Sequence, residues 1–115
     1  MPYKHNETLL LRYLGPSPIL RMIDFFLDNP LSDYSKNEIA KRLEMSRVTF
    51  FKYWVELEKS GAVKITRKIG RATLYKLDDK NEIVKQLVKL DMALARHAMQ
   101  KASERYKRPI MVKSR

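Results

Sequence analysis

Basic side chains without acidic neighbours are the residues of this chain with the clearest chemistry. From Lys59 to Lys76 there are six basic residues and no acidic one. Four of them are expected in or beside a turn at Gly70: Arg67, Lys68, Arg71 and Lys76. Lys and Arg bind phosphates and release condensed counterions, and Arg also suits a narrow minor groove. The pattern favours contact with a nucleic acid duplex, although an exposed edge strand protected by lysine would have a similar composition.

A short β-hairpin is predicted to position these cations. Between residues 63 and 77, apolar and β-branched residues alternate with polar ones, and Gly70-Arg71 interrupts the pattern with a pair suited to a tight turn. The apolar positions are Val63, Ile65, Leu74 and Leu77. The segment is therefore predicted to be a hairpin whose turn carries basic residues.

Two short helices are predicted before the hairpin. Ser35 and Glu38 have the spacing of a capping box, which places the start of the first helix at Lys36. Ser46 is the N-cap candidate of the second helix, which continues without Gly or Pro to Gly61, a residue suited to a left-handed C-terminal cap. The predicted buried faces are Ile39, Ala40 and Leu43 in the first helix, and Phe50, Trp54 and Leu57 in the second.

The second helix has more apolar residues than one buried face requires. The side opposite that face is mostly polar or basic, with Ser46, Arg47, Lys52 and Lys59. Among these lie Val48, Phe51 and Val55. In one interpretation the three side chains complete the core against the first helix or a partner. In the other, some of them contact thymine methyl groups in a major groove, where apolar contact distinguishes thymine from the other bases.

Two segments resemble parts of a known family. SRVTFFKYWVELEKSGAV, at residues 46–63, is similar to the recognition helix and exit turn of small archaeal and bacterial winged helix-turn-helix transcriptional regulators, of the MarR-like or ArsR-like type. IGRATLYKL, at residues 69–77, is similar to their wing. The resemblance covers roughly residues 17–95. The order of two capped helices and a basic hairpin likewise predicts a winged helix-turn-helix, a mainly α fold with a small β-hairpin, and the pattern of the following residues adds a long C-terminal dimerisation helix.

The resemblance also implies a DNA-binding site. In such regulators, residues of the recognition helix approach base edges or phosphates. With the N-cap included, the matching positions here are Ser46, Arg47, Thr49, Phe51, Lys52 and Tyr53. The basic wing residues, expected beside the adjacent minor groove, are Arg67, Lys68 and Arg71. The chain departs from the usual pattern at Phe51 and Val55, where small or polar residues are commoner.

Residues 17–28 are predicted to form the opening helix of the domain. Ser17 is a suitable N-cap, Pro18 suits the first helical position, and Asn29-Pro30 ends the helix. Asp24 and Asp28 form an i, i+4 pair that we interpret as part of a solvated helix face. Upstream, residues 1–16 hold a short apolar segment, which we expect to be a helix packed across a partner.

A long helix is predicted after the hairpin. Asp79 and Glu82 repeat the capping-box spacing, and neither Gly nor Pro occurs from Lys80 to Lys107. Its two apolar stripes are a seam of Ile83, Leu87, Leu90 and Leu94 and a second line that includes Val84 and Val88. We expect one stripe to pack on its own domain and the other on a second copy, giving a homodimer. A helix folded back along one monomer is the alternative.

The positive charge is concentrated in the second half of the chain. The net charge is +11, and residues 61–115 hold fifteen basic and five acidic residues. Such a field attracts polyanions without distinguishing DNA from RNA or anionic lipid. Pro109 is expected to end the long helix, leaving a tail that is either solvated or adds phosphate contacts. The predicted organisation is an N-terminal segment at 1–16, a winged helix-turn-helix at 17–77, a dimerisation helix at 78–108 and a basic tail at 109–115.

Several classes of function are disfavoured. The chain has no cysteine, and His5 and His97 lack partners at metal-ligand spacing, so neither a metal nor another cofactor is expected. Three glycines form no nucleotide-binding loop, and no nucleophile and base have a recognisable spacing, so we expect no enzyme. No apolar run approaches the ~20 residues that span a bilayer, which predicts a cytoplasmic protein without membrane contact. A small apolar effector could bind between the opening and closing helices, but no residue identifies one.

Three functions are consistent with these patterns. The leading hypothesis is a homodimeric, sequence-specific regulator of transcription, a repressor, that binds double-stranded DNA. The second is a winged-helix domain that binds proteins of the replication or transcription machinery, because fold does not fix function. The third is a sequence-neutral DNA-binding protein of chromosome or plasmid maintenance, which differs from the first in its specificity ratio.

Overall fold

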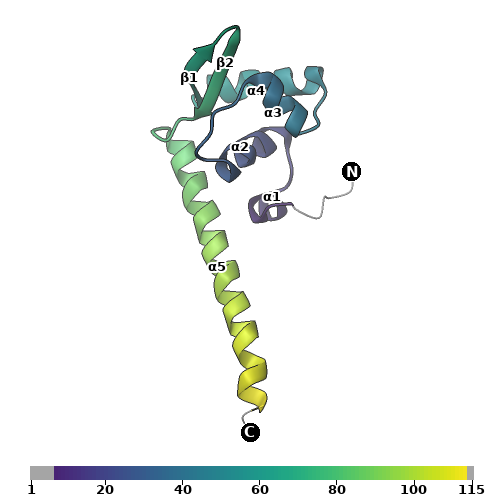
Figure 1. Cartoon of the computed structure of the whole chain (residues 1–115), viewed down its shortest axis with the longest axis vertical. Coiled ribbons are helices and arrows are strands. Elements are labelled where there is room, and N and C mark those ends of the chain that lie inside the picture. The colour runs from purple at the N-terminus through teal and green to yellow at the C-terminus, as the bar shows by residue number, and fades with distance from the viewer. Residues whose placement is uncertain (1–6, 114–115) are drawn as a thin grey trace.

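Short helices and one hairpin form one end of the molecule, and a long helix extends from it (Figure 1). The computed structural model describes the backbone of residues 7–113 and the side chains of residues 7–105. Along this part the elements are α1 (Leu9–Leu14), α2 (Pro18–Asp28), α3 (Lys36–Arg42), α4 (Arg47–Lys59), β1 (Val63–Ile69), β2 (Ala72–Leu77) and α5 (Glu82–Lys113). The predicted fold class, mainly α with a small hairpin and a long C-terminal helix, is confirmed.

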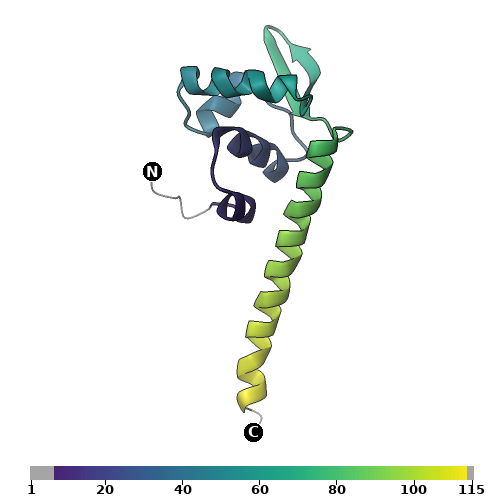
Figure 2. The ribbon, with the colours of Figure 1, turned by 180° about the vertical axis from the view of Figure 1, so that it is seen from behind.

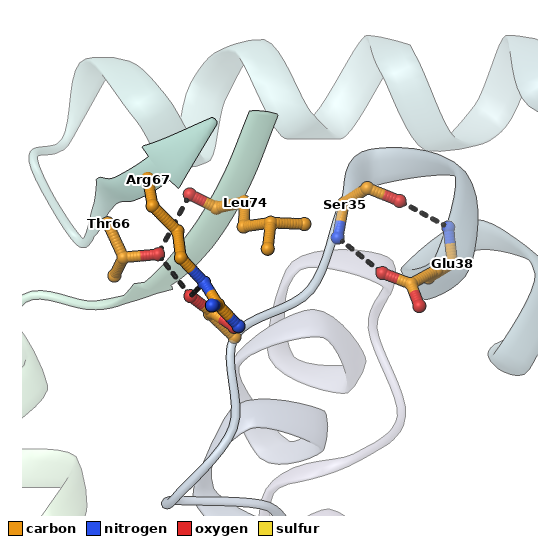
Figure 3. Close-up of polar contacts among 6 residues, drawn as sticks. Ser35, Glu38, Thr66, Arg67 and Leu74 are labelled. Atoms are coloured by element: carbon orange, nitrogen blue, oxygen red, sulfur yellow. Dashed lines mark hydrogen bonds and ion pairs between the residues drawn. The ribbon is translucent and has the colours of Figure 1, made fainter. Parts of the chain in front are cut away.

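Serine side chains cap the first turns of α2, α3 and α4, and these helices begin where the sequence predicts. The Ser17 hydroxyl accepts a hydrogen bond from the backbone of Leu20 at 3.2 Å, as Pro18 occupies the first helical position. At α3, Ser35 and Glu38 form both bonds of the predicted capping box (Figure 3). Each cap satisfies a backbone N–H that the helix leaves without a partner, and this fixes the helix start.

Aromatic side chains from α2, α4 and β2 fill the core. Trp54 is 1% exposed and stacks on Phe50, with ring centroids 5.4 Å apart. The edge of Tyr75 meets Trp54 at 5.0 Å, and Phe26 lies 6.5 Å away on α2. The predicted buried stripe of Phe50, Trp54 and Leu57 is therefore confirmed. These contacts determine which side of α4 faces outward.

The hairpin forms with the predicted turn. Gly70 has a φ of +59°, a left-handed conformation that a residue without Cβ adopts at no steric cost. The register shifts after Ile65, which leaves Thr66 as an extra residue in β1 and produces a β-bulge. Lys76 lies opposite Lys64 at the base of the hairpin. The expectation that Lys76 lies beside the turn is wrong, because β2 carries it several residues along the strand away from Gly70.

The start of α5 differs from the prediction. The helix begins at Glu82, and the cap is Asn81, whose side-chain oxygen accepts from the backbone of Val84 at 3.1 Å. The same amide donates through its nitrogen to the carbonyl of Ser60, at the end of α4, at 3.0 Å. The predicted capping box of Asp79 and Glu82 is wrong, because Asp79 lies inside a turn that the Asn81 N–H closes by donating to the Asp78 carbonyl at 3.0 Å. One amide therefore connects the end of α4 to the start of α5.

The end of α5 also differs. The helix continues through Pro109 to Lys113, so the expectation that Pro109 ends it is wrong. Proline lacks the N–H that would donate to the carbonyl four residues earlier, so the last turn continues with one bond fewer. The side chains of the predicted basic tail, residues 109–115, lie outside the described residues.

The N-terminal segment forms a helix, α1, which packs within its own chain. Leu10 is fully buried, and α1 contacts both α2 and α5. Whether this helix also contacts a partner stays a prediction, and residues 1–6 lie outside the described part. The Thr8 hydroxyl caps α1 and donates to a carboxylate oxygen of Asp24 at 2.8 Å.

Asp24 is buried, and its interpretation as part of a solvated helix face is wrong. Its exposed fraction is 6%, because α1 covers this side of α2. Burial raises the pKa of Asp24, the hydrogen bond from Thr8 lowers it, and the nearby carboxylates of Asp28, Asp91 and Glu7 raise it further. Burial and Asp28 also raise the pKa of Asp91 on α5. Acidic groups from α2, from α5 and from the residue before the N-cap of α1 therefore lie close together.

Candidate nucleic-acid interface

The outward side of α4 carries lysines and two exposed valines. Val48 is 81% exposed and Val55 is 47% exposed, and Lys52 and Lys59 are also exposed. The four positions follow a spacing of four, three and four residues, which places them along one line of an α-helix. We call this line the outer stripe. It lies opposite the buried face, so Val48 and Val55 do not complete the core.

The first turn of α4 is organised by its cap. The Ser46 hydroxyl accepts from the backbone N–H of Thr49 at 3.1 Å and donates to the Thr49 hydroxyl at 3.0 Å. Arg47, the first residue of the helix, places its guanidinium carbon 5.6 Å from the centre of the Phe51 ring. Ser46 and Arg47 are exposed and Thr49 is half-buried. These predicted DNA-binding residues thus lie together at one end of α4.

Phe51 and Tyr53 differ from the other predicted contacts, because both are half-buried and pack against the core. Phe51 has two cations over its ring, Arg47 and also Lys36 at 5.9 Å. Lys52 lies 5.4 Å from the centre of the Tyr53 ring. An aromatic face attracts a cation and limits its movement. The geometry suits these two rings to positioning cations, and their contact with DNA stays a prediction.

Lys36 is a basic residue of this region that the sequence analysis did not select. It is the first residue of α3, and its ammonium lies 5.7 Å from the centre of the Tyr75 ring as well as over Phe51. Its position at a helix start beside aromatic rings depends on packing between α3, α4 and β2. The sequence offered one local indication of this residue, since Lys36 directly follows the N-cap Ser35.

Lys68 and Arg71 are exposed at the tip of the hairpin. Lys68 lies opposite Thr73, next to the turn that contains Arg71. Figures 1 and 2 show the hairpin and α4 at the end of the molecule opposite the far end of α5. The structure therefore brings two groups of predicted DNA-binding residues to the same end of the molecule.

Arg67 is held by an acidic residue from outside the hairpin. Its guanidinium donates two hydrogen bonds to the Asp33 carboxylate, at 3.0 and 3.1 Å, and the Thr66 hydroxyl donates to the same carboxylate at 2.5 Å. Figure 3 shows the side chains of Arg67 and Thr66 turned towards the carboxylate that accepts these bonds. The bonds from Arg67 and Thr66 lower the pKa of Asp33 to about 2. Asp33 lies between α2 and α3, so this bidentate pair attaches the hairpin to the rest of the domain.

The Asp33 contact changes the predicted character of the wing. Between Lys59 and Lys76 the sequence has no acid, but folding supplies one from about 34 residues away. The charge of Arg67 is thereby largely neutralised, whereas Lys68 and Arg71 remain exposed at the tip. Arg67 stays a predicted DNA contact, but its present geometry suits a residue that positions the wing.

Within the described residues, no three His, Cys, Asp or Glu side chains come together in a group that could hold a metal ion. In the same part of the chain, no helix combines the length and the apolar character needed to cross a bilayer.

Solved structures similar to this chain cover most of its length. HlyU from Vibrio cholerae is 26% identical, with a TM-score of 0.52 over 70% of this chain and 79% of its own. NadR, in complex with 4-hydroxyphenylacetate, is 15% identical, with a TM-score of 0.57 over 98% of this chain and 94% of its own. Transcriptional regulator PA4135 is 17% identical, with a TM-score of 0.54 over 90% and 77%. These structures are winged-helix transcriptional regulators.

This chain has the winged helix-turn-helix fold. No protein-family model and no curated protein sequence matches it. In this winged helix-turn-helix, α3 and α4 form the two-helix motif, β1 and β2 form the wing, and α5 follows the wing.

The long helix of this winged helix-turn-helix protein divides its apolar residues between core and solvent. Val84 is 1% exposed, and Leu87 and Val88 pack against the same core. Ile83 and Leu90 are exposed, and so are Met92 and Met99 further along α5. Val84 was predicted in the dimer interface, but its own chain already covers it. The exposed apolar residues of α5 therefore do not correspond to either one of the two predicted stripes.

Proposed function

We propose that this chain is a double-stranded DNA-binding transcriptional regulator, a cytoplasmic repressor without catalytic activity. The observation that carries the proposal is that α4 and the wing tip expose cationic side chains at the same end of the molecule. Helix α4 would enter a major groove, and Lys68 and Arg71 would contact the adjacent backbone or minor groove. The likeness to winged-helix regulators supports this assignment.

The proposed regulator acts as a homodimer. Ile83, Leu90, Met92 and Met99 expose apolar surface along α5 that the described part of the chain does not cover. Pairing of two α5 helices about a two-fold axis would remove this surface from water. Such a dimer would bind a palindromic site with half-sites about 34 Å apart, or a multiple of this distance.

Selection of bound sequences from a pool of random duplexes tests the proposal. A recovered palindrome would support sequence-specific binding by a symmetric dimer. With the selected duplex, the logarithm of the binding constant should fall against the logarithm of the salt concentration with a slope of about −7, if the dimer neutralises about eight phosphates. Binding that does not change with salt would contradict the proposal, and equal competition by unrelated duplexes would indicate a sequence-neutral protein.

A protein-interaction module is the second candidate, and the exposed Val48 and Val55 favour it. An exposed apolar residue on a helix can be the anchor of a protein interface. Substitution of both Lys68 and Arg71 by alanine separates the two functions. A DNA-binding regulator should lose affinity for duplex DNA, whereas an adaptor that uses the valines should keep its affinity for its protein partner.

A further inference from the structure

The outer stripe of α4, defined by Val48, Lys52, Val55 and Lys59, alternates apolar and cationic side chains. Trp54 and Phe50 point to the other side, where both are almost completely buried. Val48 at 81% exposure and Val55 at 47% therefore have no role in holding α4 to the domain. Both are β-branched residues, which favour the helix less than alanine or lysine does, so helix propensity does not account for them either.

The surroundings of the two valines restrict what they could contact. Arg47 lies beside Val48, and Lys52 and Lys59 flank Val55 in the outer stripe. The three cations outnumber the two exposed glutamates of α4, so the occupant that fits this surface is anionic and offers apolar groups at the points facing the valines. The major groove of DNA meets both conditions, because its edges are lined by phosphates and the C5-methyl of thymine is the one methyl group that its bases present there.

We propose that Val48 and Val55 read thymine methyl groups in the major groove. This inference rests on the proposed DNA-binding function and specifies the base that the helix selects. The two valines are seven residues apart, which corresponds to ~10 Å along an α-helix. Base pairs are stacked about 3.4 Å apart along the duplex axis, and a helix in the groove is inclined to that axis, so the two thymines would lie at most about three steps apart in each half-site, on either strand.

Uracil substitution tests this reading, because deoxyuridine differs from thymidine only by the missing methyl group. The probes are a duplex selected from a random pool and the same duplex with each thymine replaced in turn by uracil. At two positions in each half-site, the affinity of the wild-type protein should fall about fourfold, which corresponds to the ~0.8 kcal/mol of one buried methyl group. At the other thymines the affinity should not change.

Alanine variants assign each thymine to its valine. Val48→Ala should bind the thymine and uracil duplexes equally at one position and keep the discrimination at the other, and Val55→Ala should show the reverse. Both sites are on the surface, so neither substitution removes a core contact. Leu31→Ala is the matched control, because Leu31 is also an exposed apolar residue but lies outside α4, and it should keep both discriminations.

The outcomes separate the inference from the function on which it rests. If duplexes bind with the expected salt dependence but every uracil substitution is neutral, the methyl reading is wrong and the regulator proposal stands. If discrimination persists unchanged in both valine variants, the assignment to these residues is wrong. If no duplex binds, both proposals fail.

Discussion

The contact between Thr8 and Asp24 allows the most exacting test of the packing described above. The Thr8 hydroxyl caps α1 and also donates to the buried Asp24 carboxylate. Thr8→Val removes both roles with little change in shape. The loss of the cap costs about 1 kcal/mol. The loss of a hydrogen bond to a charged group costs about 1.5–3 kcal/mol, so the total destabilisation should be roughly 3 kcal/mol.

A double-mutant cycle with Asp24→Asn isolates the charged hydrogen bond. In the background of Asp24→Asn, Thr8→Val removes the same cap. The hydrogen bond that it removes there joins two neutral groups, and such a bond contributes only about 0.5–1.5 kcal/mol. The two costs should therefore differ by about 1 kcal/mol. The assay is urea unfolding at pH 7 followed by the fluorescence of Trp54, which is the only tryptophan and is buried. Equal costs of Thr8→Val in the two backgrounds would refute the reasoning.

The raised pKa values of Asp24 and Asp91 predict that the stability of the protein depends on pH. Because the folded-state pKa of Asp24 and of Asp91 is raised above 3.8, the native state binds protons at a pH where the unfolded state does not. The contribution of these groups to stability therefore increases as pH falls through the raised values towards 3.8, and is lost as pH rises. Asp24→Asn should be more stable than wild type at pH 7 and should show less of this increase. A variant with an unchanged pH profile would contradict the assignment.

Three further predictions concern the wing and the joint between α4 and α5. Arg71→Ala should weaken duplex binding and reduce the salt slope by about two, one for each subunit of the dimer, whereas Arg67→Ala should change the slope less because Asp33 already neutralises that charge; salt titrations of both variants check this. Since the pKa of Asp33 is about 2 in the folded state, the ionised carboxylate stabilises the fold above pH 3.8, and this stabilisation is lost as pH falls from 3.8 through 2. The Asp33→Asn variant should not show this loss in acid titrations followed by Trp54 fluorescence. Asn81→Ala should cost about 1–2 kcal/mol in urea unfolding because it removes the α5 cap and the bond to Ser60, and Asn81→Asp, which keeps an acceptor for the cap, should cost less.

Local patterns predicted the elements that depend on neighbouring residues. The caps at Ser17, Ser35 and Ser46, the buried stripe of α4 and the turn at Gly70 all depend on residues a few positions apart, and all are confirmed. The predicted start of α5 is wrong because Asn81, two residues after Asp79, is the cap that forms. The contact of Asn81 with Ser60, which belongs to the fold and not to the local sequence, accompanies the cap that forms.

Features that depend on distant residues were not predictable in this way. Asp33 reaches Arg67, and Thr8 reaches Asp24, only after helices have packed. Charge counting within a segment therefore overestimated the positive charge of the wing, and helical periodicity placed a buried aspartate in solvent. For the candidate site, the sequence identified the outward side of α4. The exposure of Val48 and the partial burial of Phe51 depended on how the core orients the helix.

The amide of Asn81 has a mechanical consequence. Since one side chain holds the last turn of α4 and the first turn of α5, tilting α5 must either carry α4 with it or break one of the two hydrogen bonds of this amide. In a two-fold assembly built on α5, the separation of the paired α4 helices would follow the crossing angle of the long helices. A change in the packing of α5 far from the hairpin would thus alter the distance that the two α4 helices span at the opposite end of the molecule.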